Sequence, residues 1–238
     1  MKIRYTFLGG LLMAGLILAL PAQALPVQFN ISNDFNADVI VNGTSGNLDT
    51  TQSPMDNVSY SLATQGGLNE GCGPGLQGLP NNGLFAKNAS HPKVQLAYRN
   101  SNFGQNVRRS EAGDVFSFPV PHAKYRRIHF LATSGDGQSN VKVTFTYRDD
   151  STTVRNFTIG DWFEAPVAGT YSLIDQMDRM SPNGTECDES PHEFSTAHVF
   201  GKSLRPNKSK TLRKMTVEKI PGAEYSILNT LGVTGVKV

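Results

Sequence analysis

The feature that most constrains the fold is an alternation of apolar and polar residues with a period of two. It is cleanest in residues 141–147, where every second residue is apolar and the intervening ones are lysine or threonine. Successive side chains of a strand point to opposite faces of its sheet, so this segment predicts a half-buried β-strand. The apolar members are Val141, Val143, Phe145 and Tyr147.

A second strand is predicted directly after this one. Residues 149–151, Asp-Asp-Ser, predict a turn, and the β-branched run behind them ends at Phe157 and Ile159. The two segments therefore predict a hairpin. Val154 falls out of parity with Phe157 and Ile159, which predicts a β-bulge in the second strand.

Short runs of the same kind recur along the chain, separated by clusters of Gly, Pro, Asn, Asp and Ser. No window of a dozen residues keeps the apolar spacing of a helix. We therefore predict an all-β fold, a two-sheet antiparallel β-sandwich or jelly roll with long loops. The further runs are residues 37–41, 58–63, 93–98, 114–120, 125–132, 169–174, 195–201, 212–220 and 224–233.

The connections between these runs include two long irregular segments, residues 42–57 and 64–93, of the length that tends to be functional. The second contains "GCGPGLQG", which matches a dinucleotide-binding fingerprint. That fingerprint requires a buried strand before it and a helix after it, and the flanking sequence predicts neither. We interpret the match as a bend in a loop, and we expect at most a helical turn at residues 175–180.

The first 24 residues have the pattern of a secretory signal peptide. Lys2 and Arg4 precede an apolar run, and Ala22 and Ala24 form a small-residue cleavage pattern. The alternative is a retained N-terminal anchor; no later segment is apolar enough to cross a membrane. We predict a secreted or periplasmic protein with a single sandwich domain from residue 25 to 238.

The charge balance argues against a nucleic-acid partner. The chain has 22 basic and 20 acidic residues, and two of the basic residues lie in the predicted leader. The remaining chain is balanced, and it lacks the dense basic stripe with interleaved aromatic residues that nucleic-acid binding needs.

Two cysteines, Cys72 and Cys187, are present. In an exported chain an even number of cysteines predicts a disulfide bond. The alternatives, a catalytic thiol or a metal-binding pair, require neighbouring His or Cys residues that the sequence does not supply.

Charges segregate late in the sequence. Residues 161–193 contain eight acidic residues and one basic residue, and residues 199–219 contain seven basic residues and one acidic residue. Two solvated faces that partly neutralise each other would explain this. The functional alternatives are a cation site, for which calcium suits an oxygen-rich loop, and a surface for an anionic polymer. The cation set is Asp175, Asp178, Glu186, Asp188 and Glu189, and the basic set is Lys202, Arg205, Lys208 and Lys210.

A shallow sugar site needs an aromatic ring with amide and guanidinium groups beside it. Tyr98, Arg99, Asn100 and Asn102 supply this combination where a strand meets a loop, although an ordinary polar turn would have the same composition. A second pair of candidates is Asp161 and Trp162. Their structural alternative is that Trp162 fills the core while Asp161 caps a turn.

The sequence has no local signature of an activated nucleophile, neither Gly-x-Ser-x-Gly nor His-Glu-x-x-His. A glycoside hydrolase would need two carboxylates at a separation that sequence alone does not provide. We therefore predict no catalytic residues and a binding protein rather than an enzyme. The carboxylates that loops could bring together are Asp114, Asp136, Asp149, Asp161 and Glu164.

Several segments together resemble the galactose-binding-like β-sandwich found beside secreted bacterial and fungal hydrolases. The matching features are a "GLPNNG" loop, a "YRRIHFL" strand, a "VKVTFTYRD" hairpin, a "DW" pair and a "KTL" strand entry, at residues 78–83, 125–131, 141–149, 161–162 and 210–212. The resemblance implies a β-sandwich that binds carbohydrate or packs beside a catalytic domain, often with a structural calcium ion. The cysteine-bearing loops and the N-terminal third depart from the pattern.

Three functions follow as hypotheses. The first is a secreted, non-catalytic, lectin-like protein whose partner is a carbohydrate or cell-surface glycan. The second is a secreted hydrolase that acts on glycans or peptides through loop carboxylates. The third is a structural or host-interaction protein that binds another protein or a surface through the basic residues 202–214.

Overall fold

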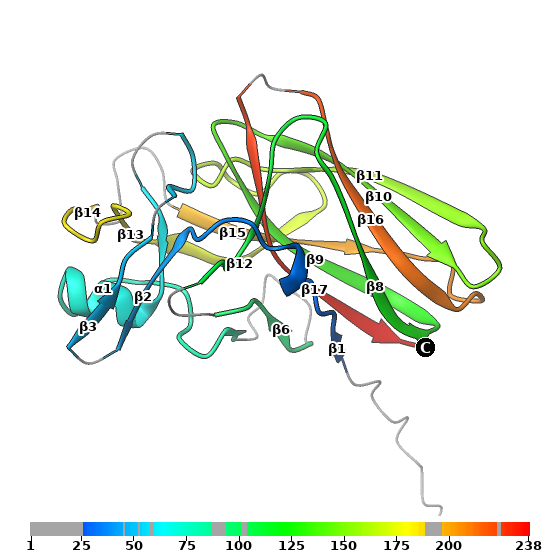
Figure 1. Ribbon diagram of the computed structural model, residues 1–238, viewed down its shortest axis with the longest axis horizontal. Helices are drawn as coiled ribbons and strands as arrows, with labels where there is room; N and C mark the ends of the chain where they lie inside the picture. Colours follow the sequence, from blue (N-terminus) through cyan, green and yellow to red (C-terminus); the bar gives the residue numbers. More distant parts are fainter. Residues whose placement is uncertain are drawn as a thin grey trace, which may run out of the picture.

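Strands dominate the architecture, which confirms the all-β prediction. The computed structural model describes residues 26–44, 46–51, 53–57, 60–86, 94–100, 104–188, 197–222 and 225–238. The predicted leader, residues 1–24, lies outside the described residues. Two antiparallel sheets form the sandwich, and a third layer built largely from the N-terminal part covers one of them (Figure 1).

The central sheet joins the two ends of the chain. Its strand order is β1-β17-β9-β15-β12, and β7 also pairs with β17. β1 is the first described strand and β17 the last, and their antiparallel pairing places the two ends of the described chain side by side in this sheet. The bounds are β1 Pro26–Gln28, β7 Arg108–Ser110, β9 Tyr125–Gly135, β12 Thr170–Met177, β15 Ala197–Leu204 and β17 Ile227–Lys237.

The second sheet contains β8 (Val115–Ala123), β10 (Ser139–Tyr147), β11 (Thr152–Ile159) and β16 (Leu212–Ile220), in the order β11-β10-β16-β8. The predicted β10–β11 hairpin is present. The predicted bulge at Val154 is wrong, since Val154 pairs in register with Thr144. Val154 is 44% exposed on the solvent face of an edge strand. Its side chain points away from Phe157 and Ile159 because it faces solvent, and not because the strand contains an extra residue.

The main core lies between these two sheets. Every second residue of β10 points into it, as the alternation predicted, and β9, β15 and β17 of the central sheet contribute the facing residues. Aromatic side chains fill much of this space and therefore make a large contribution to burial. The buried aromatic members are Phe29, Phe35, Phe116, Phe118, Tyr125, Phe130, Phe145, Tyr147, Phe157 and Phe200.

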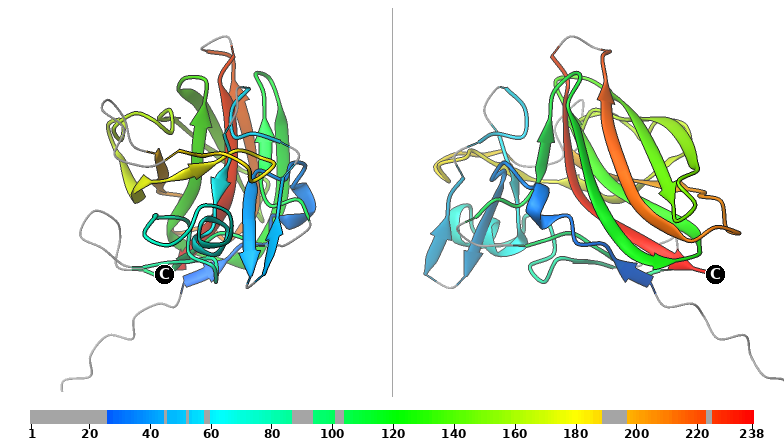
Figure 2. Two further views of the ribbon diagram at one scale, coloured as in Figure 1. Left: turned by 90° about the vertical axis from the view of Figure 1, so that its left-hand side faces the viewer. Right: turned by 45° about the vertical axis from the view of Figure 1, so that its right-hand side comes forward.

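The third layer, here called the covering layer, packs on the opposite face of the central sheet and builds a second apolar cluster there. In Figure 1 and the right panel of Figure 2, its blue and cyan segments lie across the central sheet from β8, β10, β11 and β16. Its elements are β2 Ile40–Thr44, β3 Asn47–Asp49, β4 Leu62–Ala63, α1 Gln65–Gly71, β5 Leu84–Phe85, β6 Leu96–Ala97, β13 Arg179–Met180 and β14 Cys187–Asp188. The short helix η1 (Ser32–Asp34) lies instead beside β8, between Ile31 and Phe35 of the main core.

The predicted disulfide bond is confirmed. Cys72 follows α1 and Cys187 begins β14; their Cα atoms are 5.8 Å apart across a sequence separation of 115. The bond ties the helix to the β13–β14 hairpin inside the covering layer. It also fits a protein that matures outside the reducing cytosol.

The helix α1 lies within a segment for which the sequence predicted no regular structure. Thr64 caps it, because the Thr64 Oγ1 accepts a hydrogen bond from the Gly67 N–H at 3.0 Å. The "GCGPGLQG" run follows the helix, and Gly73 and Gly75 adopt positive φ. The run is therefore a bend, as interpreted, although the segment before it is helical.

The predicted helical turn at residues 175–180 is wrong. Residues up to Met177 continue β12, and Arg179–Met180 form β13. Gln176 has a φ of 56°, and the β12–β15 register shifts between Ile174 and Met177. The segment is therefore an interrupted strand. No described helix is both long and apolar enough to span a membrane.

Candidate binding groove

The outer face of the central sheet changes character along β9. Leu131 points into the cluster beneath the covering layer. His129 and Arg127 lie two and four residues before it, so they share its face of the sheet. Arg127 is only partly buried, and the face it shares is not covered at this end.

A hollow of about 1080 Å³ lies at this uncovered end. It extends across three strands of the central sheet and one loop, and we call it the basic groove. β9 supplies one side, β15 and the loop behind it supply the other, and β17 contributes Val236. The lining residues are Val94, Arg126, Arg127, His129, Ser203, Arg205, Pro206, Asn207, Lys208, Ser209 and Val236.

Four cations line the basic groove: Arg126, Arg127, Arg205 and Lys208. No carboxylate of a described residue forms an ion pair with any of them. The groove lining itself contains no acidic residue among those that the structure describes. Arg126, Arg205 and Lys208 are exposed, so the positive charge faces solvent.

The floor of the groove is a small polar cluster. His129 and Ser203 are direct partners in the β9–β15 register, and the Ser203 Oγ lies 3.1 Å from the His129 Nδ1. The Tyr171 hydroxyl lies 2.9 Å from the same nitrogen. Burial raises the pKa of Tyr171 above its usual range, so this hydroxyl stays protonated.

Gly201 allows Tyr171 to reach this cluster. A Cβ atom on Gly201 would lie 2.2 Å from the Tyr171 ring, closer than any side chain tolerates. The ring therefore lies flat across β15 only because residue 201 is glycine. Tyr171 thereby positions His129, which is itself only 3% exposed.

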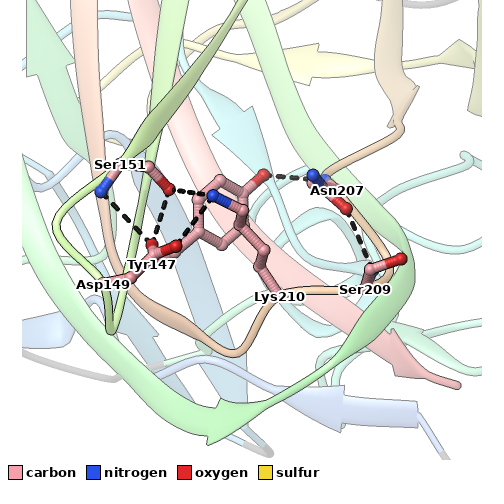
Figure 3. A network of polar contacts seen from close by, with 6 residues as sticks. All are labelled: Tyr147, Asp149, Ser151, Asn207, Ser209 and Lys210. Carbon is pink, nitrogen blue, oxygen red and sulfur yellow. Dashed lines mark hydrogen bonds and ion pairs between the residues drawn. The ribbon is translucent and has the colours of Figure 1, made fainter.

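The loop that forms one wall of the groove is held by contacts from the second sheet (Figure 3). The Tyr147 hydroxyl accepts a hydrogen bond from the Asn207 N–H at 2.7 Å. The Lys210 ammonium donates to Asp149 at 2.8 Å and to the Ser151 hydroxyl at 2.7 Å. Arg205 and Lys208 are thus carried on a fixed loop.

The electrostatics of this anchor favour the charged pair. Hydrogen bonds from Lys210 and Ser151 lower the pKa of Asp149 to about 2. Asp149 is therefore ionised throughout the physiological range. Lys210 is a member of the basic set that the sequence suggested, but it is ion-paired with Asp149 and is not among the residues that line the groove.

The structure divides the rest of that basic set. Arg205 and Lys208 line the groove, whereas the Lys202 ammonium lies 6.0 Å from the centre of the Phe157 ring. Sequence reasoning did not select Arg126 and Arg127. Their only signal was two adjacent arginines in a predicted strand, and only the strand pairing places them opposite Arg205.

The predicted sugar cluster around Tyr98 is split between two smaller hollows. Tyr98 is 5% exposed, and its hydroxyl donates to the Pro80 carbonyl at 2.6 Å. Its ring is therefore not presented for stacking. Arg99 is exposed at a hollow of about 350 Å³ that also contains Phe35. Asn100 lines a separate hollow of about 400 Å³, and Asn102 lies outside the described residues.

Asp161 and Trp162 have structural contacts. Trp162 is 1% exposed and packs beneath the covering layer. The Asp161 carboxylate accepts the N–H groups of Gly137 at 2.6 Å and Phe163 at 2.9 Å, so it caps two turns. This arrangement matches the structural alternative given for both residues.

The acidic set proposed for calcium has other contacts where it is described. Asp178 accepts the Gln77 N–H at 2.6 Å, and Asp188 pairs with Arg179. Glu186 contacts Ser181 through its backbone, with its N–H donating to the Ser181 Oγ at 2.9 Å, and its side chain is exposed. The Asp175 side chain and Glu189 are outside the described residues. Within the described chain, no group of three or more His, Cys, Asp and Glu residues is placed to hold a metal ion.

The loop carboxylates suggested for hydrolysis do not form one group. Asp136, Asp161 and Glu164 lie around one turn, because the Gly137 N–H donates to Asp161 and the Gln138 amide donates to Glu164, whereas Asp114 and Asp149 lie elsewhere with basic partners. Asp149 pairs with Lys210, Asp114 lies 3.9 Å from Arg108, and Asp136 accepts the Asn57 N–H at 2.9 Å. Burial raises the pKa of Asp161, and the neighbouring charges of Glu164 and Asp56 add to this effect.

One carboxyl pair escaped the sequence analysis. Burial, and then the charge of Asp49, raise the pKa of Asp38 to about 6, although a hydrogen bond from Asn106 opposes the shift. Neither Asp38 nor Asp49 lines any of the three hollows described above.

A search against known protein families and curated proteins found no match to this chain. The fold is compatible with a β-sandwich.

Proposed function

We propose that this protein is a secreted, non-catalytic binding protein that holds a carbohydrate in the basic groove. One observation carries the proposal: the basic groove combines guanidinium, hydroxyl and amide groups on the central sheet and the loop that follows β15. Sugars present hydroxyl groups that such donors and acceptors recognise. Arg127, Ser203 and Asn207 represent the three kinds of group.

The architecture is consistent with this function. We propose kinship with the galactose-binding-like proteins on the strand and turn residues already described. Because one fold serves many functions, the groove and not the sandwich is the stronger argument.

A non-catalytic role is proposed because the groove lacks reactive groups in a working arrangement. It contains no carboxylate among its described lining residues, so it offers no acid and base pair. Ser203 does contact His129, but the Tyr171 hydroxyl lies close to the same Nδ1. One nitrogen shared by two hydroxyls orients a polar cluster and does not single out Ser203 as a nucleophile.

A glycan array tests the proposal. Residues 25–238 are compared with the variant Arg127→Ala/Arg205→Ala and with the control Arg213→Ala/Lys214→Ala, which removes the same charge from the exposed face of β16. We expect defined glycans to bind the parent and the control, and to be lost from the groove variant. A blank array for the parent would overturn carbohydrate as the ligand, and loss from Arg99→Ala alone would move the site to the Arg99 hollow.

A further inference from the structure

We infer that the basic groove selects acidic glycans, that is, chains of sugars that bear carboxylate or sulfate groups. This inference rests on the proposed function and narrows it to one class of ligand. It comes from three features of the groove: how its cations are paired, how they are fixed, and what else lines it.

Five basic side chains of the described chain are ion-paired, whereas others, including all four cations of the groove, are not. Elsewhere in the described chain, basic side chains meet carboxylates in five ion pairs: Arg108–Asp114, Lys142–Glu218, Arg179–Asp188, Lys210–Asp149 and Arg213–Asp150. The four cations of the groove have no such partner among the described residues. An external anion would supply the missing charge.

The positive charge is local. Apart from the predicted leader, the chain has as many acidic as basic residues, so the protein as a whole does not attract anions. Charges more than about 10 Å apart in solution are largely screened at ordinary salt. Four cations around one hollow, none of them ion-paired to a described residue, therefore create a field that acts on a ligand inside it.

The geometry suits carboxylate and sulfate groups. Three of the four cations are arginines, whose planar guanidinium binds two oxygens of one anionic group at once. Arg126 and Arg127 lie on β9, and Arg205 follows β15 on a loop that Tyr147 and Lys210 hold in place (Figure 3). The backbone positions of these residues are thus fixed before the ligand arrives, which reduces the entropy lost on binding.

The remaining lining favours a sugar chain over a nucleic acid. Ser203, Asn207 and Ser209 offer neutral groups for hydroxyls. Among its described lining residues the groove has no Phe, Tyr or Trp on which bases would stack. It also lacks the stacking ring expected of a shallow sugar site, so a sugar chain would be held here through its anionic groups and hydroxyls and not by ring stacking. A volume of about 1080 Å³ is at the upper end of small-molecule pockets, so it accommodates more than one sugar ring.

Binding measured by calorimetry tests the inference on residues 25–238. The acidic probes are polygalacturonate, which bears carboxylates, and heparin, which bears sulfates; the neutral probe is dextran. Polyphosphate and single-stranded DNA represent anions without acidic sugars. We expect at least one acidic glycan to bind, and to bind about tenfold or more weakly at 200 mM than at 50 mM salt. The stronger of the two acidic probes identifies the source of the charge.

Variants place the binding in the groove. Because a hydrogen bond to a charged group contributes about 1.5–3 kcal/mol, Arg127→Ala/Arg205→Ala should weaken acidic-glycan binding by a factor of about 100 or more. The control Arg213→Ala/Lys214→Ala should change it by less than about threefold. An equal loss in both variants would contradict the inference, because it would show attraction by net charge alone. Circular dichroism spectra that match those of the parent exclude misfolding.

The remaining outcomes separate this inference from the proposed function. If only neutral glycans bind, and the groove variant loses them, carbohydrate binding stands and the acidic class is wrong. If polyphosphate or DNA binds as tightly as the acidic glycans, the selection for acidic sugars is wrong. If no glycan binds in calorimetry or on the array, both proposals fail.

Discussion

The two halves of one sheet face carry opposite chemistry. In the covered half, Leu131, Val199 and Leu231 point into a dry cluster beneath the covering layer. In the open half, Arg127 and Ser203 on two of the same strands point into the basic groove. β9 and β15 pair in continuous register from one half to the other, so the strand pairing does not separate the two halves.

The difference shows how this fold could assign stability and binding to separate places. Burial of apolar side chains is the dominant favourable contribution to folding, and the covered half supplies it. The cations of the basic groove have no carboxylate partner among the described residues, so they contribute little to folding and can interact with a ligand. Substitutions should therefore sort by half, with the covered half controlling stability and the open half controlling binding.

The largest expected effect is in the covered half. Trp162→Ala should lower the free energy of unfolding by about 3–5 kcal/mol, because a fully buried indole leaves a cavity. Arg127→Ala, in the open half, should change it by less than about 0.5 kcal/mol. Urea denaturation measures both. A loss at Arg127 as large as that at Trp162 would break the comparison.

The disulfide bond should come next. Cys72→Ser/Cys187→Ser should cost about 2–5 kcal/mol, because the bond closes a long loop in the unfolded chain. The bond lies in the covering layer, away from the groove, so ligand affinity should stay within about twofold for the protein that remains folded. Urea denaturation gives the first number and calorimetry gives the second. A large loss of affinity would show that the covering layer supports the open half.

Gly201 lies near the boundary between the halves and sharpens their separation. Gly201→Ala should cost about 1–3 kcal/mol, since the new Cβ overlaps the Tyr171 ring. The displaced ring would release the His129 contact, so the His129 ring signals should shift in the NMR spectrum. In a Tyr171→Ala background the same change should cost much less. Equal costs in both backgrounds would exclude the overlap as the cause.

The smallest expected effect is the loss at low pH of the ion pair between Asp149 and Lys210, which holds the groove loop. Because its contacts lower the pKa of Asp149 to about 2, the ion pair with Lys210 is complete above the unfolded-state value near 4. It is lost as the pH falls through about 2. NMR should show the Asp149 carboxyl titrating there, with the Asn207 amide signal moving in step. A midpoint near 4 would mean that the Lys210 contact does not form in solution.

The sequence predicted the sandwich well because its strands have local signals. Alternation marked β10, the β9 strand and β16, and two cysteines in an exported chain implied their own pairing. The helix α1 escaped because its seven residues include three glycines, and it is held by the Thr64 cap and by packing on β2. Tertiary contacts outweighed a poor helix propensity there.

The groove was only half visible in the sequence. Arg205 and Lys208 belonged to a recognisable basic segment, but Arg127 lies some 80 residues earlier. Only the register that pairs His129 with Ser203 brings these two segments together. The sugar cluster predicted at residues 98–100 failed to appear as one surface because the Tyr98 ring turns inward, and local composition does not report that direction.

The most direct test of the account observes the arginine side chains themselves. NMR of the protein with nitrogen-15 arginine, titrated with a short oligogalacturonate or heparin fragment, follows the Nε–H signals of Arg126, Arg127 and Arg205 beside those of Arg99, Arg109 and Arg179. The account predicts saturable shifts in the first three and almost none in the others. Shifts centred on Arg99, or no saturable shift at any arginine, would contradict the claim that the open half of the central sheet is the binding site.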